Sequence, residues 1–299
     1  MKINGISASS YDCYSLCAWK WYLTYVLGFS DVSSPAAFAG TLIHKALEIL
    51  SRAAINNHPR DSKIFDAQYL WDICFNHYYN LEPSTAEQLD NAKLKKICQG
   101  YYELLNGPYT PIRDNTISAE DIFNIPIQEP EFKIKGADNY FTLRGRIDRI
   151  DKINDDTIEV IDYKSGSRVN WSSPTRSKKT PEDLFEDIQP KMYHLAAKHL
   201  YPWAKNVIVT FIYFTDGGAV SVPFSDEDIE ETKSILKKRL RAIESNLDPQ
   251  QSKSWKCKNF CYFGDKSGIC DNVWDEKEEC GHKFIEQKYT MLNVRRKSK

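Results

Sequence analysis

Hydrophobic positions follow a helical spacing in the first third of the chain. Apolar residues three and four apart predict one helix over 11–27, ended near Gly28, and another from Gly40 through Leu50. The aromatic-rich segment 57–110 is also predicted to be mostly helical. This third of the chain is therefore expected to form helices.

From position 125 onward the pattern changes to the alternation that is typical of strands. Turn-forming residues at 136–139 and 154–156 separate the strands, so a β-meander is predicted. Its strands are expected at 125–127, 131–135, 140–151 and 157–164. A helix over 190–199, a strand over 206–215 and a helix over 226–247 then give an alternating order of α and β elements.

The charge balance argues against recognition of nucleic acid by the whole surface. The chain has 299 residues with 40 Lys and Arg against 41 Asp and Glu, a net charge of −1. A polyanion would therefore have to meet a local basic patch. With 41% hydrophobic and 13% aromatic residues, the chain has enough apolar surface to fold around a core. No GxxxxGK(S/T) motif occurs, which argues against a nucleotide-driven motor.

No apolar run has the length that a membrane span needs, and the first residues lack the apolar stretch of a signal peptide. We therefore expect a cytoplasmic protein without membrane association. In that compartment the eight cysteines should be reduced thiols or metal ligands rather than disulfides.

Two aspartates and a lysine are predicted to converge on the central hairpin. If this hairpin turns around Asp155, Asp148 lies opposite Asp162, and strand alternation places Lys164 on the same face. Two carboxylates at close range need a cation between them, and oxygen ligands suit Mg²⁺ or Mn²⁺. Such an ion beside a lysine indicates phosphodiester hydrolysis. The alternative is an ordinary cross-strand charge cluster on a solvated face.

Four motifs occur in the order found in one nuclease family. The hairpin contains Gly145-Arg-Ile-Asp-Arg-Ile-Asp151, followed by Ile161-Asp-Tyr-Lys-Ser-Gly166. Gly40-Thr-Leu-Ile-His44 lies upstream, and Gln189-Pro-Lys-Met-Tyr193 lies downstream. The ordered set resembles RecB-like nucleases of the PD-(D/E)XK superfamily. The resemblance implies an α/β (α+β) fold with a restriction-endonuclease-like core, in which helices flank a mixed central β-sheet, a helical region precedes it and a cysteine-rich metal-cluster tail follows.

The resemblance also implies a role for each matched residue. The implied metal ligands are His44, Asp148, Asp162 and the main-chain carbonyl of Tyr163. The implied catalytic residues are Asp148, Asp162, Lys164, Gln189 and Tyr193. Gln189 and Tyr193 lie one helical turn apart, where they would hold the substrate strand or the lysine. The alternatives are that His44 is a core histidine and that Tyr193 is only packed. Glu131 loosely matches an acidic residue that the family often has before the hairpin.

The cysteines near the C-terminus are spaced C-x3-C-x8-C, and another lies in an N-terminal segment similar to a family motif. In iron–sulfur members of the family, one N-terminal and three C-terminal cysteines hold a [4Fe–4S] cluster. The implied ligands are Cys17, Cys257, Cys261 and Cys270. The spacing is wider than is usual in the family, so a Zn²⁺ site that uses Cys280 or His282 stays open, and Cys13 could replace Cys17. Cys74 and Cys98 are expected in the core.

The segment 164–180 contains no acidic residue and is expected to form a basic loop beside the metal site. Its cationic side chains would contact phosphates, and Trp171 would stack on a base. The predicted DNA-binding residues are Arg168, Trp171, Arg176, Lys178 and Lys179. The alternative is a solvated run of charges.

We therefore predict a metal-dependent DNA nuclease, namely an exonuclease that acts on DNA ends or single strands in recombination, repair or CRISPR and phage DNA processing. It would be similar to iron–sulfur exonucleases of CRISPR adaptation and recombination, with a helicase or recombination protein as partner. The alternative is a non-catalytic DNA-binding scaffold that keeps the fold. One nuclease domain is expected over 1–285, with a helical insertion at 55–115, a catalytic core at 120–250, a cluster-binding tail at 255–282 packed with the N-terminal segment, and then a basic tail at 286–299.

Overall fold

The computed structural model describes residues 4–30, 35–88, 91–170, 173–215, 218–259 and 261–297. The chain divides into two units. The central unit comprises 33–125 and 143–234, and the terminal unit comprises 1–32, 126–142 and 235–299. The predicted single domain over 1–285 stays a prediction.

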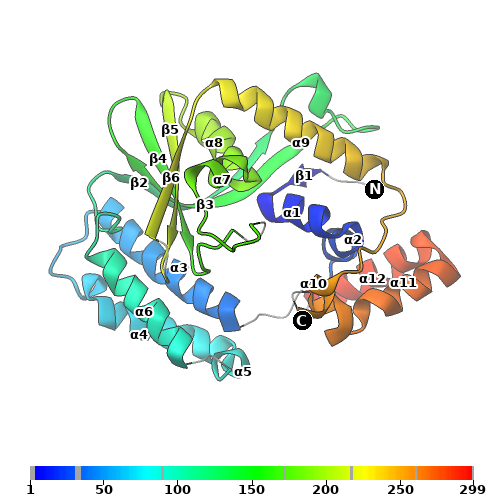
Figure 1. Ribbon diagram of the computed structural model, residues 1–299, viewed down its shortest axis with the longest axis horizontal. Helices are drawn as coiled ribbons and strands as arrows, with labels where there is room; N and C mark the ends of the chain where they lie inside the picture. The colour runs from blue at the N-terminus through cyan, green and yellow to red at the C-terminus, as the bar shows by residue number, and fades with distance from the viewer. Residues whose placement is uncertain are drawn as a thin grey trace. The chain divides into compact units, whose positions relative to one another are not determined.

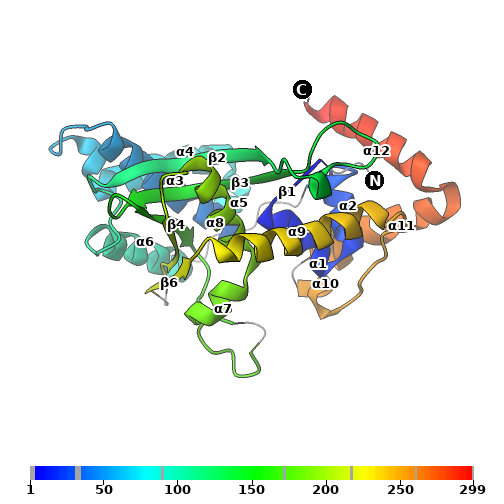
Figure 2. The same cartoon turned by 90° about the horizontal axis from the view of Figure 1, so that it is seen from above.

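A mixed sheet forms the middle of the central unit (Figure 1). The strands of this sheet that lie mainly in the central unit are β2 (Thr116–Pro126), β3 (Thr142–Lys152), β4 (Thr157–Lys164), β5 (Asn206–Tyr213) and β6 (Gly218–Phe224). Strand β3 pairs with β2, which runs beside it in Figure 2, and with antiparallel β4. Strand β4 pairs in parallel with β5, and β5 pairs antiparallel with β6. The predicted mixed central sheet is confirmed.

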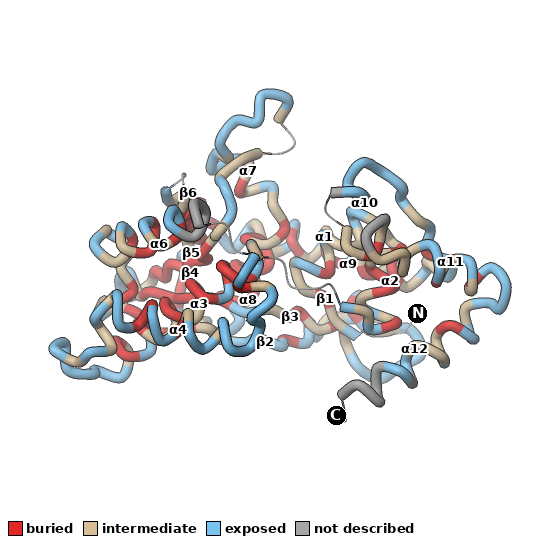
Figure 3. The backbone as a smooth tube through the Cα atoms, turned by 90° about the horizontal axis from the view of Figure 1, so that it is seen from below, coloured by how far each residue is buried: buried red, intermediate tan, exposed pale blue. Residues whose placement is uncertain are grey.

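Helices cover both faces of this sheet. On one face, α3 (Pro35–Ile55), α4 (Ala67–Leu81) and α6 (Asn91–Leu105) share a hydrophobic core with Ile161 and Tyr163 of β4. On the other face, α8 (Ile188–Leu200) packs on β4 and β5 after the short helix α7 (Pro181–Glu186). All residues of β4 except the last are buried, as is typical of a strand that is covered on both faces (Figure 3). The remaining elements are η1 (Lys63–Phe65), α5 (Pro83–Ala86) and α9 (Glu227–Ser245), which continues into the terminal unit.

Two motif glycines are required by close packing. A Cβ atom at Gly145 would lie 2.3 Å from the ring of Phe123, so any side chain there would collide with the neighbouring strand. At Gly40, a Cβ atom would lie 3.0 Å from the hydroxyl of Ser165. These glycines therefore let β2 and α3 approach the hairpin closely.

Aromatic packing joins the two ends of the chain in the terminal unit. Trp19 is fully buried, its ring stacks 5.3 Å from that of Tyr22, and it meets the edge of Trp274 at 5.0 Å. Its indole N–H donates to the Cys270 carbonyl at 3.1 Å. The elements of this unit are β1 (Gly5–Ile6), α1 (Ala8–Leu16), α2 (Ala18–Tyr25), η2 (Pro130–Phe132), α10 (Trp255–Asn259), η3 (Tyr262–Lys266), α11 (Ile269–Cys280) and α12 (His282–Lys297). None of the helices within the described ranges is both long and apolar enough to cross a bilayer.

Two sequence-based expectations about elements were wrong, and one strand was missed. The single helix over 11–27 breaks at Cys17, whose backbone is extended and whose sulfur accepts the N–H of Lys20 to cap the second half. The strand over 131–135 is instead the short 3₁₀ turn η2, which begins at Pro130. Strand β6 was not predicted at all, although its pattern of burial alternates.

His194 on α8 is a buried imidazole that the fold keeps neutral. Its ring stacks on Phe224 with centroids 5.2 Å apart, and neither ring nitrogen has a hydrogen-bond partner among the described residues. Burial lowers the pKa of His194 from 6.5 to about 4. Protonation of this ring is therefore easier in the unfolded chain than in the folded one.

Replacement of His194 by phenylalanine should remove an acid-dependent loss of stability. Between the unfolded pKa of 6.5 and the folded pKa of about 4, only the unfolded state binds this proton, so stability falls as pH is lowered. At pH 5 this difference in proton binding should lower the free energy of unfolding of the wild type by about 2 kcal/mol relative to pH 8. Urea unfolding at both pH values measures it, with His199→Phe on the exposed side of α8 as control. An equal acid loss in wild type and His194→Phe would contradict the prediction.

Candidate functional site

The hairpin of the central unit brings two buried carboxylates together. Its register pairs Arg149 with Ile161 and Ile150 with Val160, so the hairpin is centred on Asp155 as predicted. Asp148 and Asp162 therefore share one face of the sheet, and they are only 8% and 3% exposed. The Oδ2 atom of Asp148 accepts the main-chain N–H of Tyr163 at 2.7 Å. Neighbouring carboxylates at this depth need positive charge or hydrogen bonds around them.

Three side chains hold Asp162. The ammonium of Lys164 lies 2.7 Å from its Oδ2 atom. Its Oδ1 atom accepts the Tyr193 hydroxyl at 2.8 Å and the Gln189 amide at 3.0 Å. The amide oxygen of Gln189 also accepts Lys164 at 2.8 Å. Gln189 and Tyr193, which share one face of α8, thus orient both the carboxylate and the ammonium.

Asp148 of β3 also forms a group suited to a metal ion, together with His44 of α3 and Glu120 of β2. The Nδ1 atom of His44 lies 3.4 Å from Asp148 Oδ1 and 3.8 Å from Glu120 Oε1. In the part of the chain that the structure describes, this is the one group of three or more such residues whose ligand atoms all lie within 4.8 Å. The group borders an open cavity of about 460 Å³. Asp162, by contrast, directs its oxygens to Lys164 and α8.

Glu120 was missed by sequence reasoning, because strand β2 begins nine positions earlier than the predicted strand at 125. The backbone of Glu120 has φ +55°, a left-handed conformation that is rare for residues other than glycine. Its side chain is 7% exposed, and its second oxygen lies 3.1 Å from Arg146. Glu131, which was matched loosely to this acidic position, lies in η2 of the terminal unit. The apolar alternation of β2 was the signal that could have located Glu120.

Electrostatics in this group favour a positive charge between the carboxylates. Burial opposes the charge on His44, but hydrogen bonds with Asp148 and Glu120 and the charges of both aspartates raise its pKa to about 10. Burial and the charge of Asp162 raise the pKa of Asp148, against the opposing effect of His44. An imidazole and two carboxylates are also a donor set that suits Mn²⁺ or Mg²⁺. The residues therefore fit a divalent cation.

Comparison with known proteins agrees with this geometry. Residues 5–270 match the family model of the PD-(D/E)XK nuclease superfamily. The chain belongs to this superfamily.

Relatives of this superfamily member include two proteins that are named as subunits of an ATP-dependent helicase/deoxyribonuclease. The chain is 24% identical over 165 residues to that of Lactococcus lactis subsp. lactis and 28% identical over 169 residues to that of Streptococcus uberis. These matches cover 54% and 55% of this chain but only 15% and 14% of the two relatives. A candidate exonuclease from Eubacterium rectale has a similar fold, with a TM-score of 0.54, 11% identity and coverage of 86% of this chain and 87% of that one.

On the opposite face of the hairpin, the Gly145–Asp151 motif supplies a buried ion pair. Arg149 and Asp151 are both fully buried and bond through two contacts of 2.8 and 2.6 Å. The guanidinium also donates to the Tyr163 hydroxyl and to the Tyr109 carbonyl, each at 2.9 Å. The ring of Tyr163 in turn meets that of His44 edge-on at 6.2 Å. The ion pair thus anchors the tyrosine that follows Asp162 and contacts His44.

The described residues of the predicted basic loop contact one another and the segment that follows the loop. Val169 and Lys178 form a β-bridge, and Arg168 donates to the carbonyl of Lys179 at 2.7 Å. The ammonium of Lys179 pairs with Asp187. Arg176 and Lys178 are exposed, whereas Trp171 lies outside the described residues.

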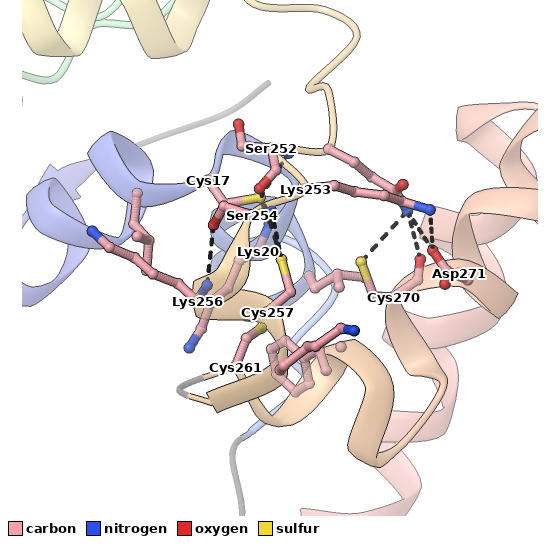
Figure 4. Close-up of a pocket in the computed structure, with 16 residues that line it drawn as sticks. Cys17, Lys20, Ser252, Lys253, Ser254, Lys256, Cys257, Cys261, Cys270 and Asp271 are labelled. Carbon is pink, nitrogen blue, oxygen red and sulfur yellow. Dashed lines mark hydrogen bonds and ion pairs between the residues drawn. The ribbon is translucent and has the colours of Figure 1, made fainter.

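The four predicted cluster cysteines line one pocket of about 200 Å³ in the terminal unit: Cys17, Cys257, Cys261 and Cys270. In Figure 4, the sulfur atoms of the first, second and fourth of these turn toward the same space. Main-chain N–H groups of Lys20 and Ser252 reach the sulfur of Cys17 at 3.4 and 3.5 Å. The N–H of Ser254 reaches Cys257 at 3.4 Å, and the Gln251 amide reaches Cys270 at 3.4 Å. Such donors stabilise thiolate sulfur.

The alternative ligands do not line this pocket. His282 bonds instead to Asp248 at 3.0 Å and to the Tyr22 hydroxyl at 3.4 Å. Cys280 is exposed at the end of α11, and Cys13 is half-buried on α1. Cys74 and Cys98 lie in or against the helical core of the central unit, as expected.

Removal of Arg149 alone should destabilise the protein more than removal of the whole ion pair. Arg149→Met leaves the Asp151 charge buried without its partner and should cost about 3 to 5 kcal/mol. The double variant Arg149→Met/Asp151→Leu should recover most of this loss, because no charge then stays buried. Urea unfolding measures both, with Asp155→Asn at the exposed hairpin turn as control. Equal losses in the single and double variants would sink the prediction.

Proposed function

We propose that this chain is a divalent-metal-dependent DNA nuclease that acts as an exonuclease on DNA ends or single strands. The observation that carries the proposal is the group His44, Glu120 and Asp148 beside the Asp162–Lys164 pair. Superfamily membership supports phosphodiester hydrolysis. The names of the relatives support DNA as substrate and a helicase as partner. A role in recombination or repair rests on the family resemblance of the motifs.

In this proposal His44, Glu120 and Asp148 hold Mg²⁺ or Mn²⁺. Asp162 and the main-chain carbonyl of Tyr163 are the further ligands that the family motifs imply. A bound ion of this kind stabilises negative charge on a phosphoryl oxygen. The proposal thus adds Glu120 to the ligand set inferred from the sequence.

The remaining residues position charge for the reaction. Lys164, fixed by Asp162 and Gln189, presents an ammonium that can donate to a phosphate oxygen as its negative charge grows. Gln189 and Tyr193 keep the Asp162 carboxylate from rotating, so they act as positioning residues. The basic loop side chains would bind the phosphates of the DNA strand: Arg168, Arg176, Lys178 and Lys179. The role of Trp171, stacking on a base, is inferred from the sequence alone, because this residue lies outside the described residues.

We further propose that the cysteine pocket holds a [4Fe–4S] cluster. Four thiols line it, and four N–H groups reach their sulfurs. A tetrahedral Zn²⁺ with bonds of about 2.3 Å would bring its sulfurs to about 4 Å from one another. Among the described residues, no three cysteine sulfurs lie within 4.8 Å of one another, and this wider spacing supports the larger cluster. The cluster would link the N-terminal and C-terminal segments of the chain within the terminal unit.

End-labelled DNA should be degraded by the wild type with Mg²⁺ or Mn²⁺, and Asp162→Asn should lower the rate by about 100-fold or more, because charge stabilisation at the phosphate is lost. Gel electrophoresis of single-stranded and duplex substrates measures the rates and separates stepwise from internal cleavage. Asp155→Asn, an exposed aspartate of the same hairpin, is the matched control. Wild-type protein that binds DNA but never cleaves it would favour a non-catalytic scaffold.

The DNA cleavage assay also tests Glu120 as a metal ligand. Glu120→Gln should raise the Mn²⁺ concentration that gives half-maximal cleavage and weaken Mn²⁺ binding in calorimetry. Glu131→Gln, which lies in the terminal unit, should change neither quantity.

Anaerobically purified wild-type protein should be coloured and contain about four iron atoms and four sulfides per chain. Cys17→Ser should lose the visible absorption, because one of four thiolates is missing, whereas Cys280→Ser should keep it. Absorption spectra and metal analysis measure both. A colourless protein with one zinc per chain would contradict the cluster.

A further inference from the structure

The segment that carries Cys257 has an unusual composition. Residues 252–258 read Ser-Lys-Ser-Trp-Lys-Cys-Lys, with three lysines and no acidic residue in a chain whose net charge is −1. Lys253, Lys256 and Lys258 are exposed and line the cysteine pocket together with Lys20. We name residues 252–258 the Lys-Trp segment.

Positive charge dominates this rim. Asp271 is the acidic residue that lines the pocket, and its ion pair with Lys253 at 3.2 Å offsets one of the four lysine charges. Figure 4 shows Lys20, Lys253 and Lys256 around the space that the cysteines border. The thiolates of the proposed cluster would account for part of this positive charge, since nearby ammonium groups would offset their negative charge. They do not account for an aromatic side chain among the lysines.

Trp255 is that aromatic side chain. It is 62% exposed at the start of α10, with Lys253 before it and Lys256 directly after it. A single exposed apolar residue needs no explanation by itself. An exposed indole between cationic side chains, however, matches the chemistry of an unpaired nucleotide: a flat base that stacks and a phosphate on either side. A base inside a duplex is already stacked on its neighbours, so this arrangement favours a single strand.

We propose that the Lys-Trp segment binds single-stranded DNA, with Trp255 stacked on a base and Lys253, Lys256 and Lys258 at phosphates. The proposal rests on the proposed function, since it takes DNA as the substrate. It adds a contact on the terminal unit to the basic loop of the central unit. The nuclease would thereby hold its strand at two separate places.

Fluorescence anisotropy with a labelled oligothymidylate tests the site in buffer without divalent cations, where the full-length protein binds but does not cleave. Trp255→Ala should weaken binding by about tenfold, and Trp255→Phe should restore most of it, because a ring that stacks is kept. The control is Trp203→Ala, an exposed tryptophan of the central unit at 44% exposure, which should bind as the wild type does. Binding of the same sequence as a duplex should not depend on Trp255.

The lysines are tested through salt dependence. The double variant Lys256→Gln/Lys258→Gln should lower the slope of log affinity against log salt concentration by about 0.7 for each phosphate contact removed. Lys237→Gln/Lys238→Gln, an equal charge change on exposed positions of α9, should leave the slope unchanged.

Failure of this site can be told from failure of the nuclease. If Trp255→Ala and the lysine variant bind oligothymidylate as tightly as the wild type, the site is overturned even when the wild type cleaves DNA, and the indole then belongs to a protein contact. If the variants lose affinity as expected, the site stands even when the wild type and Asp162→Asn both fail to cleave DNA.

Discussion

Two carboxylates buried at opposed positions of one hairpin are the constraint around which the central unit is arranged. Asp148 and Asp162 repel each other, and burial removes the water that would weaken this repulsion. The neighbouring groups offset the cost: a main-chain N–H and His44 at Asp148, and Lys164 with two neutral donors at Asp162. The imidazole and carboxylate oxygens of this site are a donor set that suits a divalent cation.

The reverse face of the same hairpin explains how this arrangement keeps its shape. Arg149 and Asp151 are taken fully out of water, which is tolerable only because their polar atoms have partners on β2, β4 and the segment after α6. These partners tie the hairpin to its surroundings in one register. One of these partners is Tyr163, whose hydroxyl accepts a hydrogen bond from Arg149 and whose ring contacts His44. The buried ion pair therefore supports the residues that face the cavity.

The terminal unit offers a different chemistry from the central unit. Soft sulfur donors line its pocket, whereas imidazole and carboxylate oxygens face the cavity of the central unit. The near-zero net charge also conceals local groups of one sign, such as the lysines around the cysteines and the carboxylates of the central unit. The balance of 40 positive against 41 negative side chains hides a sorting of charge into separate sites. Net charge alone therefore said little about the partner of this chain.

Local rules were enough to predict the hairpin register and the face that Gln189 and Tyr193 share, whereas the mixed sheet was implied by the family resemblance. Alternation along strands and the turn at Asp155 determine the hairpin register. Helical periodicity places Gln189 and Tyr193 on one face of α8. Local rules did not predict the break at Cys17 or the left-handed residue Glu120. By itself the sequence indicated His44, Asp148 and Asp162 as candidate site residues. Tertiary structure decided that Glu120, not Glu131, lies beside His44 and Asp148. The reason is physical: an unfavourable backbone conformation persists only where surrounding packing and charge over-determine it, and neither is local in the sequence.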